Sequence, residues 1–322
     1  MKDKPKAELE ESHYYFPREF KGYGESPPNF NWPHNPKIIV NFVVNYEEGA
    51  EMTIENKDSS SEQYIWELPY VPHHGVRSYD CESDFEYGSR VGIWRLLRAF
   101  KKYNWKFTTF GVGKAFELMP EVAQALESQG HEISSHCYRW YDYSKLSIEE
   151  EKDLIYKNMN CFKRIFGRYP KGWYYARLSQ HSYRLVYDVY QELGADLLWM
   201  GDSYCDDLPY YKPVPKTEDA LLMIPYSYDN NDARFHMPTG WSSSDDFFIH
   251  LKNSFDCLYE EGKDLGVPKM MTVALHARVI TKPGRMPALM KFMQYVKERE
   301  DEVWVATREE IANHFKKVNP YK

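Results

Sequence analysis

Carboxylates and histidines stand at the ends of apolar segments in this chain, where the strands of a sheet would deliver them to a common site. Glu47 and Glu48 follow the run KIIVNFVVNY and precede a glycine. His136 ends the segment HEISSH, and His276 follows MMTVAL. Carboxylates and imidazoles are groups that general acid–base catalysis uses. We interpret these side chains as candidates for proton transfer or substrate binding at an active site.

Further polar or aromatic side chains occupy comparable positions at or just beyond other expected strand ends. They are Arg139, Trp140, Arg177, Asp202, Asn231 and Asp232. Arginines can stabilise a developing negative charge, and amide or carboxylate groups can bind urea-like N–H and C=O groups. Each candidate also has a structural interpretation. Adjacent carboxylates are usually a solvated loop, His136 could be a hydrogen-bonded core histidine, and residues 229–232 could form a turn.

The elements that would position these residues alternate between strand and helix. Strands are expected at 37–49, 106–112, 131–136, 171–176, 197–202, 220–227, 270–277 and 303–307, and helices at 87–103, 115–130, 147–167, 182–194, 245–262, 288–300 and 308–317. This alternation predicts an α/β fold with a parallel sheet, closed or nearly closed into a (β/α) barrel. Catalytic groups of such a barrel lie at the carboxyl ends of its strands. An open doubly wound sheet is the alternative.

The chain divides into an arm and one domain. Residues 1–35 are polar and proline-rich, which predicts an extended N-terminal arm, and residues 36–322 are expected to form the single barrel domain. Residues from about 50 to 86 show no clear period, so we interpret them as an insertion after the first strand. This insertion could shape the mouth of the site.

The composition of the 322 residues argues against several classes of protein. A net charge of −7 disfavours nucleic-acid and anionic-membrane partners. No apolar run is long enough to span a bilayer, and the N-terminus lacks the apolar core of a secretory signal. The 5 cysteines are widely spaced without a CxxC pair, which disfavours a disulfide framework or a zinc knuckle. We therefore expect a cytoplasmic protein, and the arm and the 27 tyrosines suggest a homo-oligomer.

Several of these segments resemble the motifs of the polysaccharide deacetylase (NodB-type) superfamily, whose fold is a distorted (β/α) barrel. In the TFDDG motif of that family, the first aspartate acts as the catalytic base and the second binds a divalent metal. This motif corresponds here to NYEEG at 45–49. The H[ST]xxH motif, whose histidines complete the metal site, corresponds to 136–140, where Trp140 replaces the second histidine. The arginine and leucine-histidine motifs match Arg177 and His276. Because an indole has no lone pair for a metal, we expect no catalytic metal and no other cofactor.

The same departures resemble one branch of the superfamily, the metal-independent allantoinases. The matching segments span residues from about 15 to 320 and are NYEEG, YGSRVGIWRLL, GHEISSHCYRW, GWYYAR, DDLPYY, IPYSYDNNDARF and LHAR. The resemblance implies a hydrolase of purine catabolism that opens the hydantoin ring of allantoin to give allantoate. It also implies a tetramer and a small-molecule substrate.

Residue roles follow from this resemblance and from the chemistry of amide hydrolysis. Glu47 matches the base position of the family, and His276 is the candidate acid for the leaving nitrogen. Arg177 or Arg139 could replace the metal as the oxyanion donor. Glu48 would orient the water or bind substrate N–H groups. The expected substrate-binding set is Glu48, His136, Arg139, Trp140, Arg177, Asp202, Asn231 and Asp232.

Two alternatives stay open. Fungal members of the branch are also described as chitin deacetylases, and N-deacetylation of chitin or a chitooligosaccharide would use Glu47 and His276 in the same roles. A long open groove would favour such a polymer, whereas a small closed pocket would favour allantoin. Loss of the metal ligands is also what a non-catalytic binding or structural protein would show, although the retained polar residues argue against that interpretation.

Overall fold

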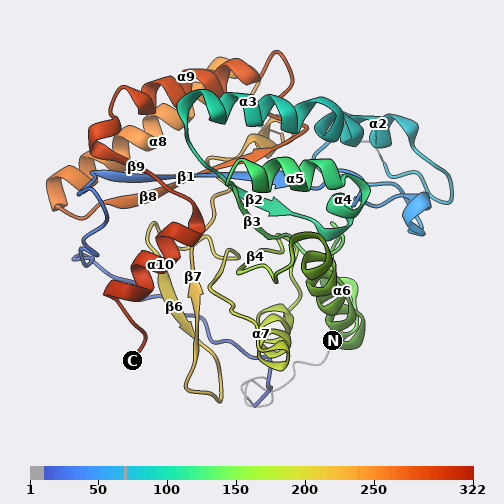
Figure 1. Cartoon of the computed structure of the whole chain (residues 1–322), viewed down its shortest axis with the longest axis horizontal. Helices are drawn as coiled ribbons and strands as arrows, with labels where there is room; N and C mark the ends of the chain where they lie inside the picture. The colour runs from blue at the N-terminus through green and yellow to red at the C-terminus, as the bar shows by residue number, and fades with distance from the viewer. Residues whose placement is uncertain (1–10, 69–70, 239) are drawn as a thin grey trace.

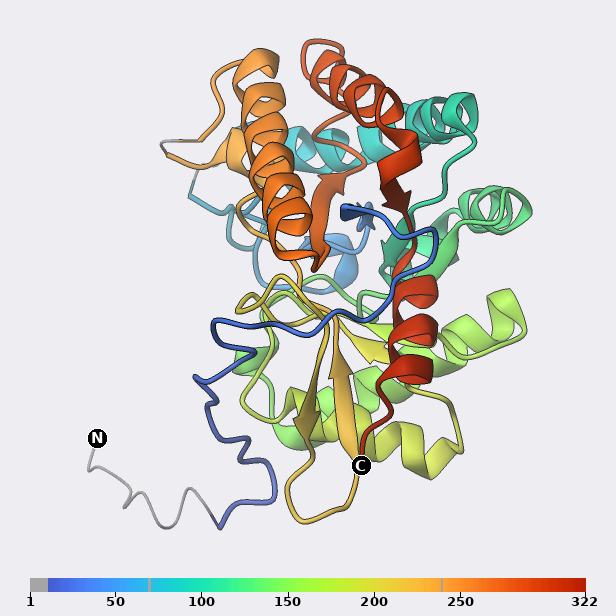
Figure 2. The same cartoon turned by 90° about the vertical axis from the view of Figure 1, so that its left-hand side faces the viewer.

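The computed structural model describes residues 11–68, 71–238 and 240–322, which fold around one curled sheet with helices outside it (Figures 1 and 2). The strand order is β6-β7-β5-β4-β3-β2-β1-β8, and β9 also pairs with β1. The pairs within this sheet are parallel except for β6 and β7. The fold is thus a distorted (β/α) barrel, which confirms the predicted class over an open doubly wound sheet.

The strands lie close to the predicted segments. Their bounds are β1 Ile38–Tyr46, β2 Thr108–Gly111, β3 Glu132–Ser135, β4 Gly172–Trp173, β5 Trp199–Met200, β6 Tyr210–Pro213, β7 Ala220–Met223, β8 Lys269–His276 and β9 Val303–Val305. The antiparallel strand β6 was not predicted. Its sequence YYKP has neither a buried apolar run nor a clean alternation, and it is only partly buried beside β7.

The helices between the strands also follow the prediction, with two differences. Their bounds are α2 Tyr79–Tyr87, α3 Ile93–Tyr103, α4 Gly113–Leu118, α5 Pro120–Ser128, α6 Ile148–Phe166, α7 Ser182–Leu193, α8 Ser244–Leu265, α9 Met286–Lys297 and α10 Arg308–Val318. The helix expected at 115–130 is broken in two because Pro120 cannot continue it and begins α5 instead. The helix expected from residue 87 starts earlier, at Tyr79, and passes through a π-helical turn at Gly88–Gly92.

Strand β1 lies between β2 and β8, also pairs with β9, and fixes where the site lies. All nine of its residues are buried, and its Phe42 contacts Phe100 of α3 and Phe292 of α9 edge-on. In the ladder with β8, Asn45 is paired with His276. Because β1, β2, β3 and β8 are adjacent and parallel, the residues after β1 and β3 and the end of β8 meet at one edge of the barrel.

The N-terminal segment runs along the barrel in an extended path (Figure 2). The Tyr23 hydroxyl donates to the Pro209 carbonyl, and the Asn29 amide donates to the Gly266 carbonyl at 2.6 Å. Residues 1–10 of the predicted arm and residues 69–70 of the predicted insertion lie outside the described residues. Within the described part of the chain, no helix is both long enough and apolar enough to cross a membrane.

Candidate active site

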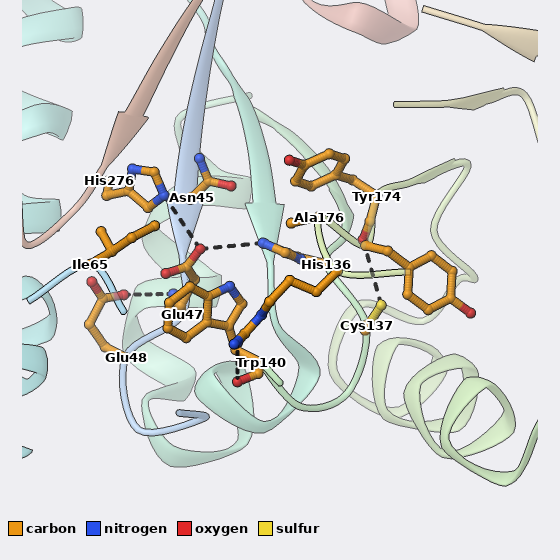
Figure 3. Close-up of polar contacts among 12 residues, drawn as sticks. Asn45, Glu47, Glu48, Ile65, His136, Cys137, Trp140, Tyr174, Ala176 and His276 are labelled. Atoms are coloured by element: carbon orange, nitrogen blue, oxygen red, sulfur yellow. Dashed lines mark hydrogen bonds and ion pairs between the residues drawn. The ribbon is translucent and has the colours of Figure 1, made fainter. Parts of the chain in front are cut away.

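Glu47 is the centre of a buried cluster at the carboxyl end of β1. Its Oε1 lies 3.3 Å from His136 Nε2 and 3.6 Å from His276 Nε2, as Figure 3 shows. Its Oε2 accepts a hydrogen bond of 2.8 Å from Arg278 Nη1. Burial opposes ionisation, but Arg278 and His276 outweigh it and hold the pKa of Glu47 well below its ordinary value. Glu47 is therefore an anion that faces two imidazoles.

His276 is oriented by Asp232, which lies behind it. Asp232 Oδ1 is 2.6 Å from His276 Nδ1, and its Oδ2 accepts the backbone N–H groups of His276 and Ile280. This contact places the proton on Nδ1 and turns Nε2 toward Glu47. Burial alone would lower the pKa of His276, but the charges of Glu47 and Asp232 outweigh it and raise this pKa. His276 thus favours the imidazolium form, which can act as an acid.

His136 has the opposite electrostatic character. Burial lowers the pKa of His136, although Glu47 acts in the other direction. Its Nε2 faces Glu47, and its Nδ1 is buried without a hydrogen bond from or to any described residue. The two imidazoles that face the same carboxylate oxygen therefore have pKa values shifted in opposite directions.

Glu48 differs from its neighbour Glu47, although the two residues are adjacent in the chain. Glu48 Oε2 accepts the backbone N–H of Glu47 at 2.7 Å, and its Oε1 lies 3.7 Å from Arg278. Burial raises the pKa of Glu48 to about 7, with Arg278 opposing this shift. A Cβ on Gly88 would lie 2.1 Å from Glu48 Oε1, so only glycine lets the helical segment pack this closely. Packing around Glu48 thus favours its neutral form.

Arg177 and Trp140 form the side of the site next to His136. The Arg177 guanidinium lies 4.4 Å from the centroid of the Trp140 ring and donates to the Trp140 carbonyl at 3.0 Å. Its positive charge contributes to lowering the pKa of His136, after burial. The Arg278 guanidinium lies 5.3 Å from the same ring centroid. Trp140 therefore links the cation that binds Glu47 to a second cation.

Comparison with known proteins identifies the family. Residues 83–197 match the polysaccharide deacetylase family. A Schizosaccharomyces pombe relative, whose name assigns it to the polysaccharide deacetylases, is 40% identical over 321 residues, or 96% of this chain and 99% of the relative. The chain belongs to the polysaccharide deacetylase family.

Two solved structures of this family are similar over nearly the whole chain. A probable polysaccharide deacetylase of Pseudomonas aeruginosa PAO1 is 42% identical, with a TM-score of 0.90 over 95% of this chain and all of that one. PuuE allantoinase is 40% identical, with a TM-score of 0.90 over 96% of this chain and all of that one. The barrel is thus that of the polysaccharide deacetylases in its full extent.

Some residues that the sequence analysis selected for the site have side chains whose polar groups are already paired within the protein. The Arg139 guanidinium is used by the insertion, where it donates to the carbonyls of Ala50 and Glu51 and to Asp58 at 2.5 Å. Its N–H groups are therefore already used within the insertion. Arg177 is the better placed of the two candidates.

Three further residues, which the sequence predicted to contact substrate, have side-chain oxygens that accept backbone N–H groups in the structure. Asp202 accepts the N–H groups of Tyr175 and Ala176, and Asn231 caps the short helix that begins at Asp232 by accepting the N–H of Ala233. Asp232 contacts His276. The side-chain oxygens of these three residues are therefore already used within the protein.

Two residues that the sequence analysis left out of the site set lie next to the predicted ones. Arg278 pairs with Glu47, and Glu62 of the insertion lies 3.6 Å from Arg177. The signal for Arg278 was present, because two adjacent buried carboxylates require a cation and Arg278 ends the segment LHAR. The aperiodic insertion gave no signal for Glu62.

The buried acids of this protein predict that its stability depends on pH, and Glu51 offers a direct test of this dependence. Burial raises the pKa of Glu51 from 4.5 to about 8. The folded state then binds the Glu51 proton more tightly than the unfolded state does. The free energy of unfolding gained from this proton is lost as pH rises from about 4.5 to about 8. The slope in that window is up to about 1.4 kcal/mol per pH unit.

Glu51→Gln is expected to flatten this part of the stability curve, because glutamine keeps the acceptor for the Gly49 N–H but does not ionise. Thermal unfolding followed from pH 5 to pH 9 should show a smaller loss of Tm for the variant than for the wild type. Glu55→Gln is the control, since the Glu55 side chain is 63% exposed. Parallel curves for Glu51→Gln and the wild type would contradict the assignment.

Proposed function

We propose that this protein is a metal-independent amidohydrolase that opens the hydantoin ring of allantoin to give allantoate. The observation that carries the proposal is the enclosed arrangement of Glu47 between His136 and His276, with exposed fractions of 1%, 1% and 4%. Side chains this buried are easier for a small molecule to reach than for a polymer. The 40% identity to PuuE allantoinase over nearly the whole chain supports the same substrate.

The first step of the proposed reaction is the attack of water on the ring carbonyl. Glu47 is ionised, and its Oε1 has no hydrogen bond of good geometry from a described residue, so it can accept a proton from a water held beside His136. As the water oxygen bonds to the carbonyl carbon, negative charge moves to the carbonyl oxygen. The Arg177 guanidinium supplies the positive charge on that side of the site.

The second step breaks the C–N bond of the ring. His276 donates its Nε2 proton to the leaving nitrogen, and the electron pair of the broken bond remains on that nitrogen. Asp232 stabilises the imidazolium before this transfer and keeps Nε2 directed at the site. Return of the proton from Glu47 to His276, across the 3.6 Å between them, restores the starting state.

The residues at the family's metal position do not fit a hydrolytic metal ion. Trp140 has an N–H donor and no lone pair, while Glu48 Oε2 already accepts a backbone N–H and burial raises the pKa of its carboxyl to about 7. Among the described residues, no three His, Cys, Asp or Glu side chains are grouped so as to hold a metal. The proposed steps therefore use side chains alone.

The test is the hydrolysis of allantoin by the purified full chain after dialysis against a strong chelator. We expect allantoate to form at a rate that neither the chelator nor added zinc changes by more than about twofold. Absence of allantoate, both with and without zinc, would overturn the proposal.

The second candidate is N-deacetylation of a chitooligosaccharide, which the family membership and the name of the Schizosaccharomyces pombe relative favour. The bond broken is again an amide, so Glu47 and His276 would act in the same way. Release of acetate from N-acetylglucosamine oligomers, measured on the same protein sample, separates the two candidates. Acetate without allantoate would make the deacetylase the correct assignment.

A further inference from the structure

The insertion after β1 contains a buried carboxylate, Glu62, of which one oxygen accepts hydrogen bonds from the described residues and the other does not. The Glu62 side chain is 1% exposed. Its Oε1 accepts the backbone N–H groups of Gln63 at 2.9 Å and Tyr64 at 3.1 Å. Its Oε2 is buried and accepts no hydrogen bond from any described residue. Leaving a buried acceptor unsatisfied destabilises the fold, and more so when the group is charged, so a substrate donor at this oxygen would be favourable.

The surroundings of Glu62 Oε2 belong to the site and not to the outer surface of the insertion. The cation nearest to it is Arg177, whose Nη2 is 3.6 Å away. Arg177 in turn lies over the Trp140 ring, which also contacts the Arg278 guanidinium that binds Glu47. The next residues of the insertion reach the same place, because the Ile65 carbonyl accepts from Arg278 Nε at 2.9 Å. In Figure 3, Ile65 lies beside Glu47 and Glu48.

We infer that Glu62 determines substrate specificity, its free oxygen accepting a hydrogen bond from a urea N–H of the substrate. The inference rests on the proposed amidohydrolase function and names the class of substrate as a hydantoin with an exocyclic ureido group. A carboxylate accepts hydrogen bonds and cannot donate them. The exocyclic ureido group of allantoin presents N–H donors, and hydantoin without that group lacks them. Glu62 therefore distinguishes a hydantoin that carries an exocyclic ureido group from hydantoin itself, at a point away from the bond that breaks.

The test compares two substrates on two enzymes. Wild-type protein and Glu62→Gln are assayed with allantoin and with hydantoin, whose ring contains the same kind of amide but carries no ureido group. The glutamine oxygen can still accept the N–H groups of Gln63 and Tyr64, so the loop conformation is preserved. We expect kcat/KM for allantoin to fall about 10- to 100-fold, mainly through KM, as loss of a charge-assisted hydrogen bond predicts. The value for hydantoin should change by less than about threefold.

Glu55→Gln is the matched control, because it makes the same substitution on an exposed residue of the same insertion. An equal fall of kcat on both substrates would overturn the inference, since Glu62 would then only hold Arg177 in place. Wild-type turnover of hydantoin as efficient as that of allantoin would also overturn it, while leaving the amidohydrolase function intact. Wild-type turnover of neither substrate would remove the proposed function and this inference together.

Discussion

Replacing Glu47 by glutamine is expected to lower kcat for allantoin by about 10³-fold or more, with little change in the affinity for substrate. The glutamine side chain has nearly the same shape, but it cannot accept a proton from the attacking water. Its amide oxygen can still accept from Arg278 Nη1, which limits the disturbance of that buried cation. Single-turnover rates of allantoate formation, together with allantoin binding measured by calorimetry, check both parts of this expectation.

Glu48→Gln is the matched control, because the same substitution is made at the adjacent residue. Burial raises the pKa of Glu48 to about 7, so the side chain is largely neutral below that pH and glutamine imitates the protonated form. We expect the variant to keep kcat within about fivefold at pH 6, where the neutral carboxyl predominates. Equal losses in the two variants would show that Glu47 has no special role as the base.

Replacing Asp232 by asparagine is expected to lower kcat by about 10²- to 10⁴-fold, as the loss of the orienting aspartate does in hydrolases with a Ser-His-Asp triad. The asparagine oxygen can retain the backbone N–H groups of His276 and Ile280. Its NH₂ group then faces His276 Nδ1, which reverses the tautomer and removes the charge that stabilises the imidazolium. His276 becomes a poor acid while the fold around it is kept.

The pH profile distinguishes this effect from general damage. In the wild type, Glu47 and Asp232 raise the pKa of His276 against the effect of burial, so the acid form persists to higher pH. Without the Asp232 charge this pKa falls, and the alkaline limb of the kcat profile should move to lower pH. Asp229→Asn is the control, because that side chain is 65% exposed. A uniform loss of rate with an unmoved profile would contradict the role given to Asp232.

The parts of this molecule that the sequence predicts are those governed by local pattern and by the geometry of parallel strands. The β-branched run of β1 and the apolar run of β8 had to be buried strands. Once those strands are parallel neighbours, the residues at their carboxyl ends must meet, which brings Glu47 and His276 together. Residue type then limits the chemistry to proton transfer.

The parts that the sequence does not predict depend on contacts between distant segments. Arg139 and Arg177 are equally plausible as oxyanion donors in the sequence, and only the packing of the insertion decides between them, since Asp58 and the carbonyls of the insertion occupy Arg139. Glu62 lies in a segment without hydrophobic periodicity, so the sequence pattern does not predict that its side chain is buried. The pairing of Asp232 with His276 likewise requires knowledge of the turn that brings Asp232 behind β8.

The pairing of β1 with strands that come much later in the chain has a consequence for how the protein folds. Glu47 and Arg278, which form an ion pair, are 231 residues apart in the chain. Strand β1 pairs with β2, β8 and β9. Contacts so distant in sequence give the chain a high contact order, which slows folding. During synthesis β1 leaves the ribosome early, while β8 and β9 are still to be translated. Its apolar surface must therefore stay unpaired on one side until β8 has been translated, so the cluster around Glu47 and His276 cannot form before that strand emerges.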